Sequence, residues 1–241
     1  MRLSIIGIFA FLLCNTHVYS NLLTNGSFEN EPGSSLGSQG YYTQSITSSA
    51  TTFTINGWTF GRLAGNNNGN PRFHWYETND RPSWTNLPQD GDWAIQLNSD
   101  NRDSRLWVEQ TVAVTAGLVY ELSFHYIDES VGSFEDDEVG VTASISGVVT
   151  SSNSFQYRDD DFPASLTDTW RNETIRFTPG SSGNITIRFT DLIPSSNVQQ
   201  NVLLDNISLQ VVPEASAIIA FLTVTAACLV QRRQRKKRNA S

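Results

Sequence analysis

Apolar and polar residues alternate along much of this chain with a period of two, which is the pattern of β-strands with one buried and one solvated face. The alternation is clearest in five stretches: 92–97, 106–114, 120–126, 174–177 and 185–190. Between residues 21 and 213 no stretch sustains the spacing of an amphipathic helix. Short strands separated by Gly, Asn and Ser predict an all-β fold, specifically an antiparallel jelly-roll β-sandwich.

Three polar stretches break this rhythm, at residues 33–52, 61–91 and 128–138. We expect loops there, and long loops on a rigid sandwich often carry the contacts to ligands. Residues 179–183, with the sequence Pro-Gly-Ser-Ser-Gly, predict a hairpin-type loop between the last two alternating stretches.

The N-terminus has the three parts of a secretory signal peptide. Met1-Arg2 supplies a positive start, Ile5–Leu13 an apolar core, and Val18-Tyr19-Ser20 a cleavage site. We therefore predict a signal peptide at residues 1–20, export of the chain, and a mature N-terminus at Asn21.

The C-terminus has an uncharged stretch at 215–230, followed by a basic segment at 231–241 that holds six Lys and Arg residues. At a rise of about 1.5 Å per residue, a helix over the uncharged stretch is roughly 24 Å long, marginal for a hydrocarbon core of about 30 Å. The basic segment should remain cytoplasmic. These features predict a transmembrane helix at 215–230, with one domain, residues 21–211, outside the membrane.

The tail as a whole, residues 212–241, resembles the PEP-CTERM sorting signal of exported bacterial proteins, whose motif usually reads Val-Pro-Glu-Pro-Ser. Here the motif is Val212, Pro213 and Glu214, and Ala215 replaces the second proline. The resemblance implies a processing enzyme, an exosortase, that cuts near this motif. It implies a precursor anchored in the inner membrane and a mature form at the cell surface or in the extracellular matrix. A permanent single-pass anchor is the alternative.

Composition narrows the possible partners of the domain. Both cysteines, Cys14 and Cys228, fall in the predicted ends, so the domain has no disulfide and no thiolate site. Between residues 21 and 213 there are nine arginines, no lysine and 23 acidic residues, a net charge of −14. Such a charge excludes nucleic acid as a partner and favours cations or neutral glycans.

Four short motifs, in order, resemble galactose-binding-like carbohydrate-binding modules and the choice-anchor domains that commonly precede PEP-CTERM tails. They lie at residues 21–29, with Gly57-Trp58 after a variable loop, then at 90–97, 109–124 and 204–209. The resemblance covers nearly the whole domain. It implies a jelly-roll sandwich and a role in binding carbohydrate.

In those related modules a structural Ca²⁺ ties the first strand to the last. The resemblance implies that Glu29 and Asp205 are the side-chain ligands here, with backbone carbonyl groups completing the shell. The alternative is that both are ordinary carboxylates at strand ends, which pair with arginine or cap turns.

A glycan site needs aromatic rings to stack on sugars and planar polar side chains to bind hydroxyl groups. Trp58 and Trp93 are expected in the core. The candidate ligand contacts are Trp75, Tyr76 and Trp84, which lie in polar loop sequence, and Trp107, which lies opposite the apolar face of its strand. The alternative is that each ring packs under its own loop.

Four further side chains share the polar phase of their strands and could join Trp107, if their strands are neighbours: Glu121, His125, Arg176 and Arg188. No metal-binding histidine pair, nucleophile elbow or phosphate loop supports catalysis. We therefore expect an exported, tail-anchored, non-catalytic carbohydrate-binding protein. The alternatives are a structural surface protein without a glycan ligand and, third, a polysaccharide-active enzyme.

Overall fold

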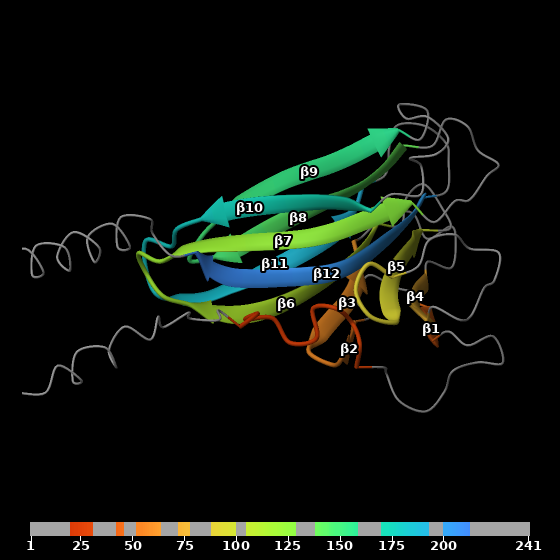
Figure 1. Ribbon diagram of the computed structural model, residues 1–241, viewed down its shortest axis with the longest axis horizontal. Coiled ribbons are helices and arrows are strands. Elements are labelled where there is room, and N and C mark those ends of the chain that lie inside the picture. The colour runs from red at the N-terminus through yellow and green to blue at the C-terminus, as the bar shows by residue number, and fades with distance from the viewer. Residues whose placement is uncertain are drawn as a thin grey trace, which may run out of the picture.

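The computed structural model describes residues 20–30, 42–45, 52–63, 72–77, 88–99, 105–128, 138–158, 170–192 and 200–212. Within these ranges the chain forms two six-stranded antiparallel sheets that lie face to face (Figure 1). The first sheet contains, in spatial order, β1 (Tyr42–Ser45), β4 (Arg72–Glu77), β5 (Trp93–Ser99), β12 (Gln200–Val212), β7 (Val119–Asp128) and β10 (Arg171–Phe177). The second contains β2 (Phe53–Ile55), β3 (Trp58–Arg62), β6 (Leu106–Val114), β11 (Gly183–Asp191), β8 (Glu138–Gly147) and β9 (Ser151–Arg158).

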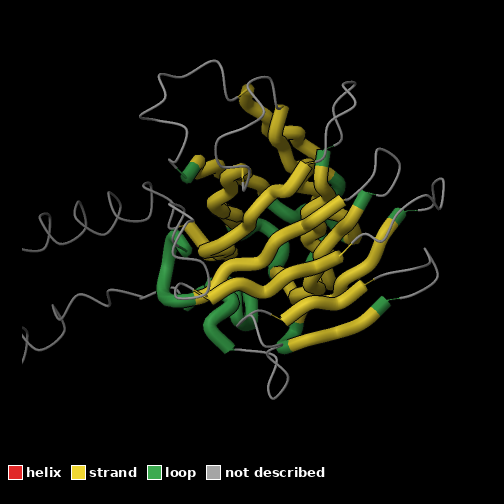
Figure 2. Tube along the Cα trace, turned by 90° about the vertical axis from the view of Figure 1, so that its right-hand side faces the viewer, coloured by secondary structure: helices red, strands yellow, loops and turns green. Residues whose placement is uncertain are grey.

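The strand pairs are nested, which makes the sandwich a jelly roll. Strand β8 pairs with β9, β7 with β10, β6 with β11 and β5 with β12. This is one long antiparallel hairpin whose successive pairs alternate between the sheets. The strands of each sheet run side by side in Figure 2. The predicted antiparallel jelly-roll sandwich is confirmed.

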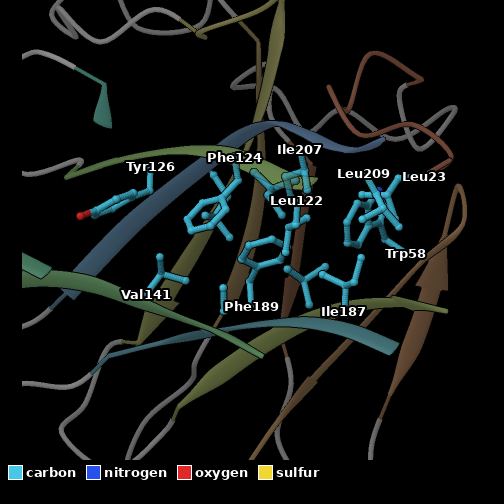
Figure 3. Packing of buried hydrophobic residues seen from close by; sticks show 14 of the residues in the cluster. Leu23, Trp58, Leu122, Phe124, Tyr126, Val141, Ile187, Phe189, Ile207 and Leu209 are labelled. Carbon is cyan, nitrogen blue, oxygen red and sulfur yellow. The ribbon is translucent and has the colours of Figure 1, made fainter. Parts of the chain in front are cut away.

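The core lies between the inner faces of the sheets (Figure 3). Leu122, Phe124 and Leu209 of the first sheet meet Ile187 and Phe189 of the second, and all five are 0% exposed. The rings of Phe124 and Phe189 make an edge contact, with centroids 4.9 Å apart. Burying each such side chain contributes about 1.5–3 kcal/mol to the stability of the fold. Because the inner faces pack against each other, a ligand site on the sheets must lie on an outer face or at an edge.

Trp58 and Trp93, predicted from the sequence to be core residues, are 0% and 7% exposed. Trp58 lies near Leu23, which comes from the start of the domain (Figure 3). The prediction that both tryptophans belong to the core is confirmed.

The first described segment, residues 21–30, runs antiparallel along β12, and we call it the N-terminal strap. The Leu22 amide donates to the Leu209 carbonyl at 2.9 Å, and the Ile207 amide donates to the Gly26 carbonyl at 2.8 Å. Phe28 of the strap is 0% exposed. The start of the domain is therefore part of its core, and it lies beside the end of β12.

Three predictions about loops and connections are wrong. The segment at 179–183 does not close a hairpin, because β10 pairs with β7 in one sheet and β11 pairs with β6 and β8 in the other. The stretches at 33–52 and 61–91 are not continuous loops, because β1 lies inside the first and β4 inside the second. The alternation of a strand does not say which strand it pairs with, and in β1 and β4 the alternation is too short or too polar to be recognised.

The predicted signal peptide at 1–20 and sorting tail at 212–241 lie almost entirely outside the described residues. In the part of the chain that is described, no helix is long and apolar enough to cross a membrane. The transmembrane helix at 215–230 and the motif residues Pro213 and Glu214 stay predictions.

Candidate functional site

Glu29 closes the N-terminal strap onto the loop that precedes β5. Its Oε2 accepts a hydrogen bond from the Asp92 amide and its Oε1 one from the Trp93 amide, both at 3.0 Å. Gly91, between the strap and these amides, has φ +71°, and a Cβ atom there would lie 2.3 Å from the Glu29 carboxyl carbon. The loop therefore fits around this carboxylate only because residue 91 is glycine.

Asp205, on the last strand, holds the preceding part of the same loop. Its Oδ2 accepts hydrogen bonds from the amides of Gln89 and Asp90, at 2.7 and 2.9 Å. Its Oδ1 accepts one from the Asn206 amide at 2.6 Å, where β12 bulges and Asn206 has φ 47°. Glu29 and Asp205 thus bind neighbouring amides of a single loop, and we call this arrangement the carboxylate clasp.

Asp205 is 0% exposed. Burial raises the pKa of its carboxyl to about 7, the three amides lower this pKa, and the charge of Asp90 raises it. A buried carboxylate with a second carboxylate nearby is an environment that a hard divalent cation would stabilise. In the described residues no three Asp, Glu, His or Cys side chains gather around one point, so backbone carbonyl groups would have to supply the other ligands.

The structure thus brings the two predicted calcium ligands to one loop, from opposite ends of the domain. Their partners are backbone amides. The carboxylate oxygens of both residues are of the ligand type that Ca²⁺ takes. Calcium binding itself stays a prediction.

Two of the three aromatic residues predicted in the loop at 61–91 lie in a strand instead. Trp75 and Tyr76 are in β4, and Trp84 lies outside the described residues. Trp75 is 2% exposed, its Nε1 donates to the Phe28 carbonyl at 3.0 Å, and its ring meets the Phe28 ring edge-on. The predictions of a loop position for these two residues, and of an open ring face for Trp75, are wrong because β4 turns Trp75 into the core. Tyr76 lies opposite Ala94 in the strand pairing.

The outer face of the second sheet carries rows of hydroxyl groups, and we call it the hydroxyl face. Residues directly opposite one another in antiparallel strands share a face, so the strand register defines its members. They are Thr54, Thr59, Thr111, Thr142, Ser144, Ser146, Ser152, Ser154, Thr186 and Thr190. Three cross-strand pairs are hydrogen-bonded: Thr54 with Thr59, Thr111 with Thr186, and Thr142 with Ser154.

Trp107, Glu109 and Arg188 lie in the middle of the hydroxyl face. Glu109 and Arg188 are direct cross-strand partners, and the Arg188 Nε and Nη2 atoms both donate to Glu109 Oε2 at 2.6 Å. The Arg188 guanidinium lies over the Trp107 ring, with its central carbon 4.3 Å from the ring centroid. On the sheet side the ring lies against Gly61, where a Cβ atom would be 2.2 Å from it.

These contacts place Trp107 on the predicted face, opposite the core residues Leu106 and Val108. They also correct the expectation that the Trp107 ring is open for stacking on a sugar. Only 7% of Trp107 is exposed, because the Gly61 backbone and the Arg188 guanidinium cover its ring. The ring does not offer an open surface for stacking.

Of the four polar residues that could accompany Trp107, only Arg188 does. Glu121, His125 and Arg176 lie on β7 and β10 and belong to the outer face of the first sheet. There the Arg176 Nε donates to Glu121 Oε2 at 2.6 Å, and the two side chains are 67% and 30% exposed. Burial lowers the pKa of His125, a shift opposed by the Asn206 backbone and by Asp90.

Sequence reasoning missed Glu109, Gly61 and the hydroxyl rows. Part of the signal was present, because the outward positions include Glu109 and Thr111 in β6 and Thr186, Arg188 and Thr190 in β11. It could not be used, because a single strand pattern does not say which strands are neighbours.

No family model and no curated protein matches this sequence. Among solved structures, the chain is similar to TmCBM61, determined with β-1,4-galactotriose, at 18% identity over 80% of this chain and 99% of that chain, with a TM-score of 0.48. The chain is also similar to the CBM22-1 xylan-binding domain of Xyn10C from Paenibacillus barcinonensis, at 12% identity over 72% of this chain and 95% of that chain, with a TM-score of 0.39. Its similarity to the K1 cleaved adhesin domain of Lys-gingipain from Porphyromonas gingivalis is 11% identity over 72% of this chain and 99% of that chain, with a TM-score of 0.42. All three TM-scores are below one half, so these likenesses assign no ligand to this chain.

Proposed function

We propose that this chain is an exported, tail-anchored, non-catalytic protein that binds carbohydrate on its hydroxyl face. The observation that carries the proposal is the group formed by Trp107, Glu109 and Arg188 in the middle of that face. A planar donor, a carboxylate acceptor and an aromatic ring lie together there, surrounded by side-chain hydroxyl groups.

The chemistry of this face suits a polyhydroxylated ligand. Charge-assisted hydrogen bonds to guanidinium or carboxylate groups are the stronger ones available for fixing sugar hydroxyls. Thr and Ser side chains both donate and accept, so their rows can pair with hydroxyls in several orientations. The row that contains Glu109 and Arg188 crosses six strands, about 4.8 Å apart, which gives roughly 24 Å of surface for an extended chain.

A non-catalytic role is supported by the charges on the hydroxyl face. Glycoside hydrolysis generally uses two carboxyl groups on either side of the scissile bond. The strand register places two carboxylate residues on this face, and each has an arginine as its direct cross-strand partner: Glu109 lies opposite Arg188, and Glu138 lies opposite Arg158. The enzyme alternative therefore has less support than binding.

Calcium is part of the proposal. We place it at the carboxylate clasp, with Glu29 and Asp205 as side-chain ligands. Its role there is structural, since the clasp joins the N-terminal strap, β12 and the loop before β5. The clasp belongs to the first sheet and the glycan site to the second.

Export and anchoring complete the proposal. The signal peptide would deliver the domain across the membrane. The tail would hold it until an exosortase-type enzyme cuts near Pro213, releasing the domain to the cell surface or matrix. What supports this is the order of motif, apolar stretch and basic cluster.

Affinity electrophoresis of the purified full-length chain tests the glycan function. The gels contain one neutral polysaccharide each (xylan, galactan, mannan or a β-glucan) in a detergent without a sugar headgroup. Retardation by at least one of them, with no reducing sugar released, is expected. Migration unchanged in every gel would favour the structural alternative, and release of sugar would favour the enzyme.

A further inference from the structure

A ligand on the hydroxyl face meets the Arg188 guanidinium before it meets an aromatic ring. Trp107 is 7% exposed, while the Arg188 side chain above its ring is 36% exposed. Stacking on an aromatic face holds a guanidinium flat and leaves its edge N–H groups available. The ring therefore orients the group that makes contact, and does not make the contact itself.

Arg188 and Glu109 keep free capacity for a ligand after pairing with each other. The pair uses two of the five guanidinium N–H donors, and both bonds end on Glu109 Oε2. A ligand hydroxyl can therefore donate to Glu109 Oε1, while a neighbouring hydroxyl accepts from Arg188. Two adjacent hydroxyl groups of a sugar match this donor and acceptor side by side.

The outer face of the first sheet holds a second pair of the same kind, which serves as an internal comparison. Arg176 and Glu121 are also direct cross-strand partners with a 2.6 Å bond. The Arg176 side chain is 67% exposed, so it is held less firmly than Arg188 on its ring. The two pairs have the same chemistry and differ in their surroundings.

Charge indicates which glycans fit. On the hydroxyl face the strand register pairs each acidic residue with an arginine: Glu109 with Arg188, which neutralise each other in an ion pair, and Glu138 with Arg158. The domain around them carries a net charge of −14 between residues 21 and 213. A polyanion would be repelled by this long-range field, and the ion pair of Glu109 with Arg188 offers it no net positive charge in compensation.

We infer, on the basis of the proposed function, that Arg188 and Glu109 are the groups that recognise the ligand. Trp107 is the positioning residue that holds the guanidinium flat, and the ligand class is a neutral glycan with adjacent free hydroxyl groups. By neutralising Arg188, the Glu109 carboxylate removes the attraction that a free arginine would offer to uronate-containing chains. In this inference the Glu109 carboxylate sets the specificity for neutral chains, and the oriented Arg188 guanidinium supplies most of the affinity.

Isothermal titration of the full-length chain, in a detergent without a sugar headgroup, tests this inference. The probes are neutral hexasaccharides (cello-, xylo-, manno- and galactohexaose) and hexagalacturonate. The variants are Arg188→Lys, which keeps the charge but loses the planar fork, Glu109→Gln, and the control Arg176→Lys on the other sheet. Trp107→Leu and Trp107→Phe test the positioning role.

We expect one or more neutral probes to bind the native chain, and hexagalacturonate to bind about tenfold more weakly or not at all. Arg188→Lys and Trp107→Leu should each weaken neutral binding about tenfold, whereas Trp107→Phe should stay within about threefold of the native chain and Arg176→Lys should leave affinity unchanged. Glu109→Gln should narrow the gap between neutral and uronate probes, a readout that a purely structural role would not move.

The outcomes separate the inference from the proposed function. Binding of neutral probes that survives Arg188→Lys, or uronate binding as tight as neutral binding in the native chain, overturns the inference and leaves glycan binding standing. Absence of binding to every probe by a folded native chain overturns the proposed function, and the inference with it.

Discussion

Gly61 shows how one residue sets the geometry of the hydroxyl face. The Trp107 ring occupies the space that a side chain at residue 61 would fill, since a Cβ atom there would lie 2.2, 2.5 and 2.8 Å from three ring atoms. The indole must therefore move when this glycine is replaced. The Arg188 guanidinium, 4.3 Å from the ring centroid, would lose its support with it.

We expect Gly61→Ala to destabilise the domain by about 1–3 kcal/mol, the usual effect of forcing extra volume into a packed position. Urea unfolding followed by tryptophan fluorescence measures the change. Gly180→Ala is the control, because a Cβ atom at residue 180 would meet nothing within 4 Å. Equal stability of the two variants would mean that Gly61 does not support the ring.

Asp205 should give the domain an unusual response to pH. Burial raises the pKa of this carboxyl from 3.8 to about 7, so between these values the folded chain holds a proton that the unfolded chain has released. In chelator, the free energy of unfolding should therefore fall as pH rises through this window. Asp205→Asn should show a shallower fall.

Urea titrations from about pH 4.5 to 7.5 in the presence of chelator measure both slopes. Comparing slopes, and not absolute stabilities, separates the titration of Asp205 from the loss of its hydrogen bonds to the amides of Gln89 and Asp90. Identical slopes would show that Asp205 is ionised in the folded chain over this range.

At the scale of elements, the carboxylate clasp joins three segments that are far apart in the sequence: the N-terminal strap, the loop before β5, and β12. Two carboxylates converge there on one loop. If a cation neutralises them, removing it should loosen all three segments together.

We expect a chelator to lower the melting temperature of the native chain, because a bound structural ion stabilises the folded state alone. Glu29→Ala should abolish this sensitivity. Glu121→Ala, which removes a carboxylate of the same sheet outside the clasp, should keep it. Melting of the native chain at the same temperature with and without chelator would leave the clasp as a set of hydrogen bonds.

The sequence predicted the sandwich well where strands alternate for seven or more residues, as in β6, β7 and β11. The five alternating stretches correspond to β5, β6, β7, β10 and β11, and the alternation did not reveal the other strands or the neighbours of any strand. Trp75 illustrates the reason: its flanking residues are polar, yet they lie in a strand that turns the tryptophan inward. Glu109 and Arg188 illustrate the same limit for the site, since the strand pairing that joins them links residues 79 positions apart.

For the whole molecule, the two ends of the domain lie together. The strap begins beside the end of β12, where Leu22 binds Leu209, and β12 ends at Val212 at the left of Figure 1. A signal peptide before Asn21 and a tail after Val212 would leave the domain from the same end. The precursor would therefore hold this end of the sandwich toward the membrane.

Mass spectrometry of the mature protein tests the processing of both ends. We expect an N-terminus at Asn21, directly after the predicted signal-peptide cleavage site, and a C-terminus near Pro213, at the predicted sorting motif. An intact C-terminal segment, 232–241, on protein at its final location would contradict processing and support a permanent anchor.

The central claim is that the hydroxyl face binds glycan, and one pair of substitutions tests it most directly. Ser144 and Ser123 are both half-buried serines on outer faces, the first on β8 beside Arg188 and the second on β7 in the opposite sheet. We measure the affinity of the full-length chain for its best neutral polysaccharide after Ser144→Arg and after Ser123→Arg. Covering the hydroxyl face should weaken binding about tenfold or more, while the change at Ser123 should leave it as in the native chain. Native affinity in Ser144→Arg, or loss of binding only in Ser123→Arg, would contradict the account.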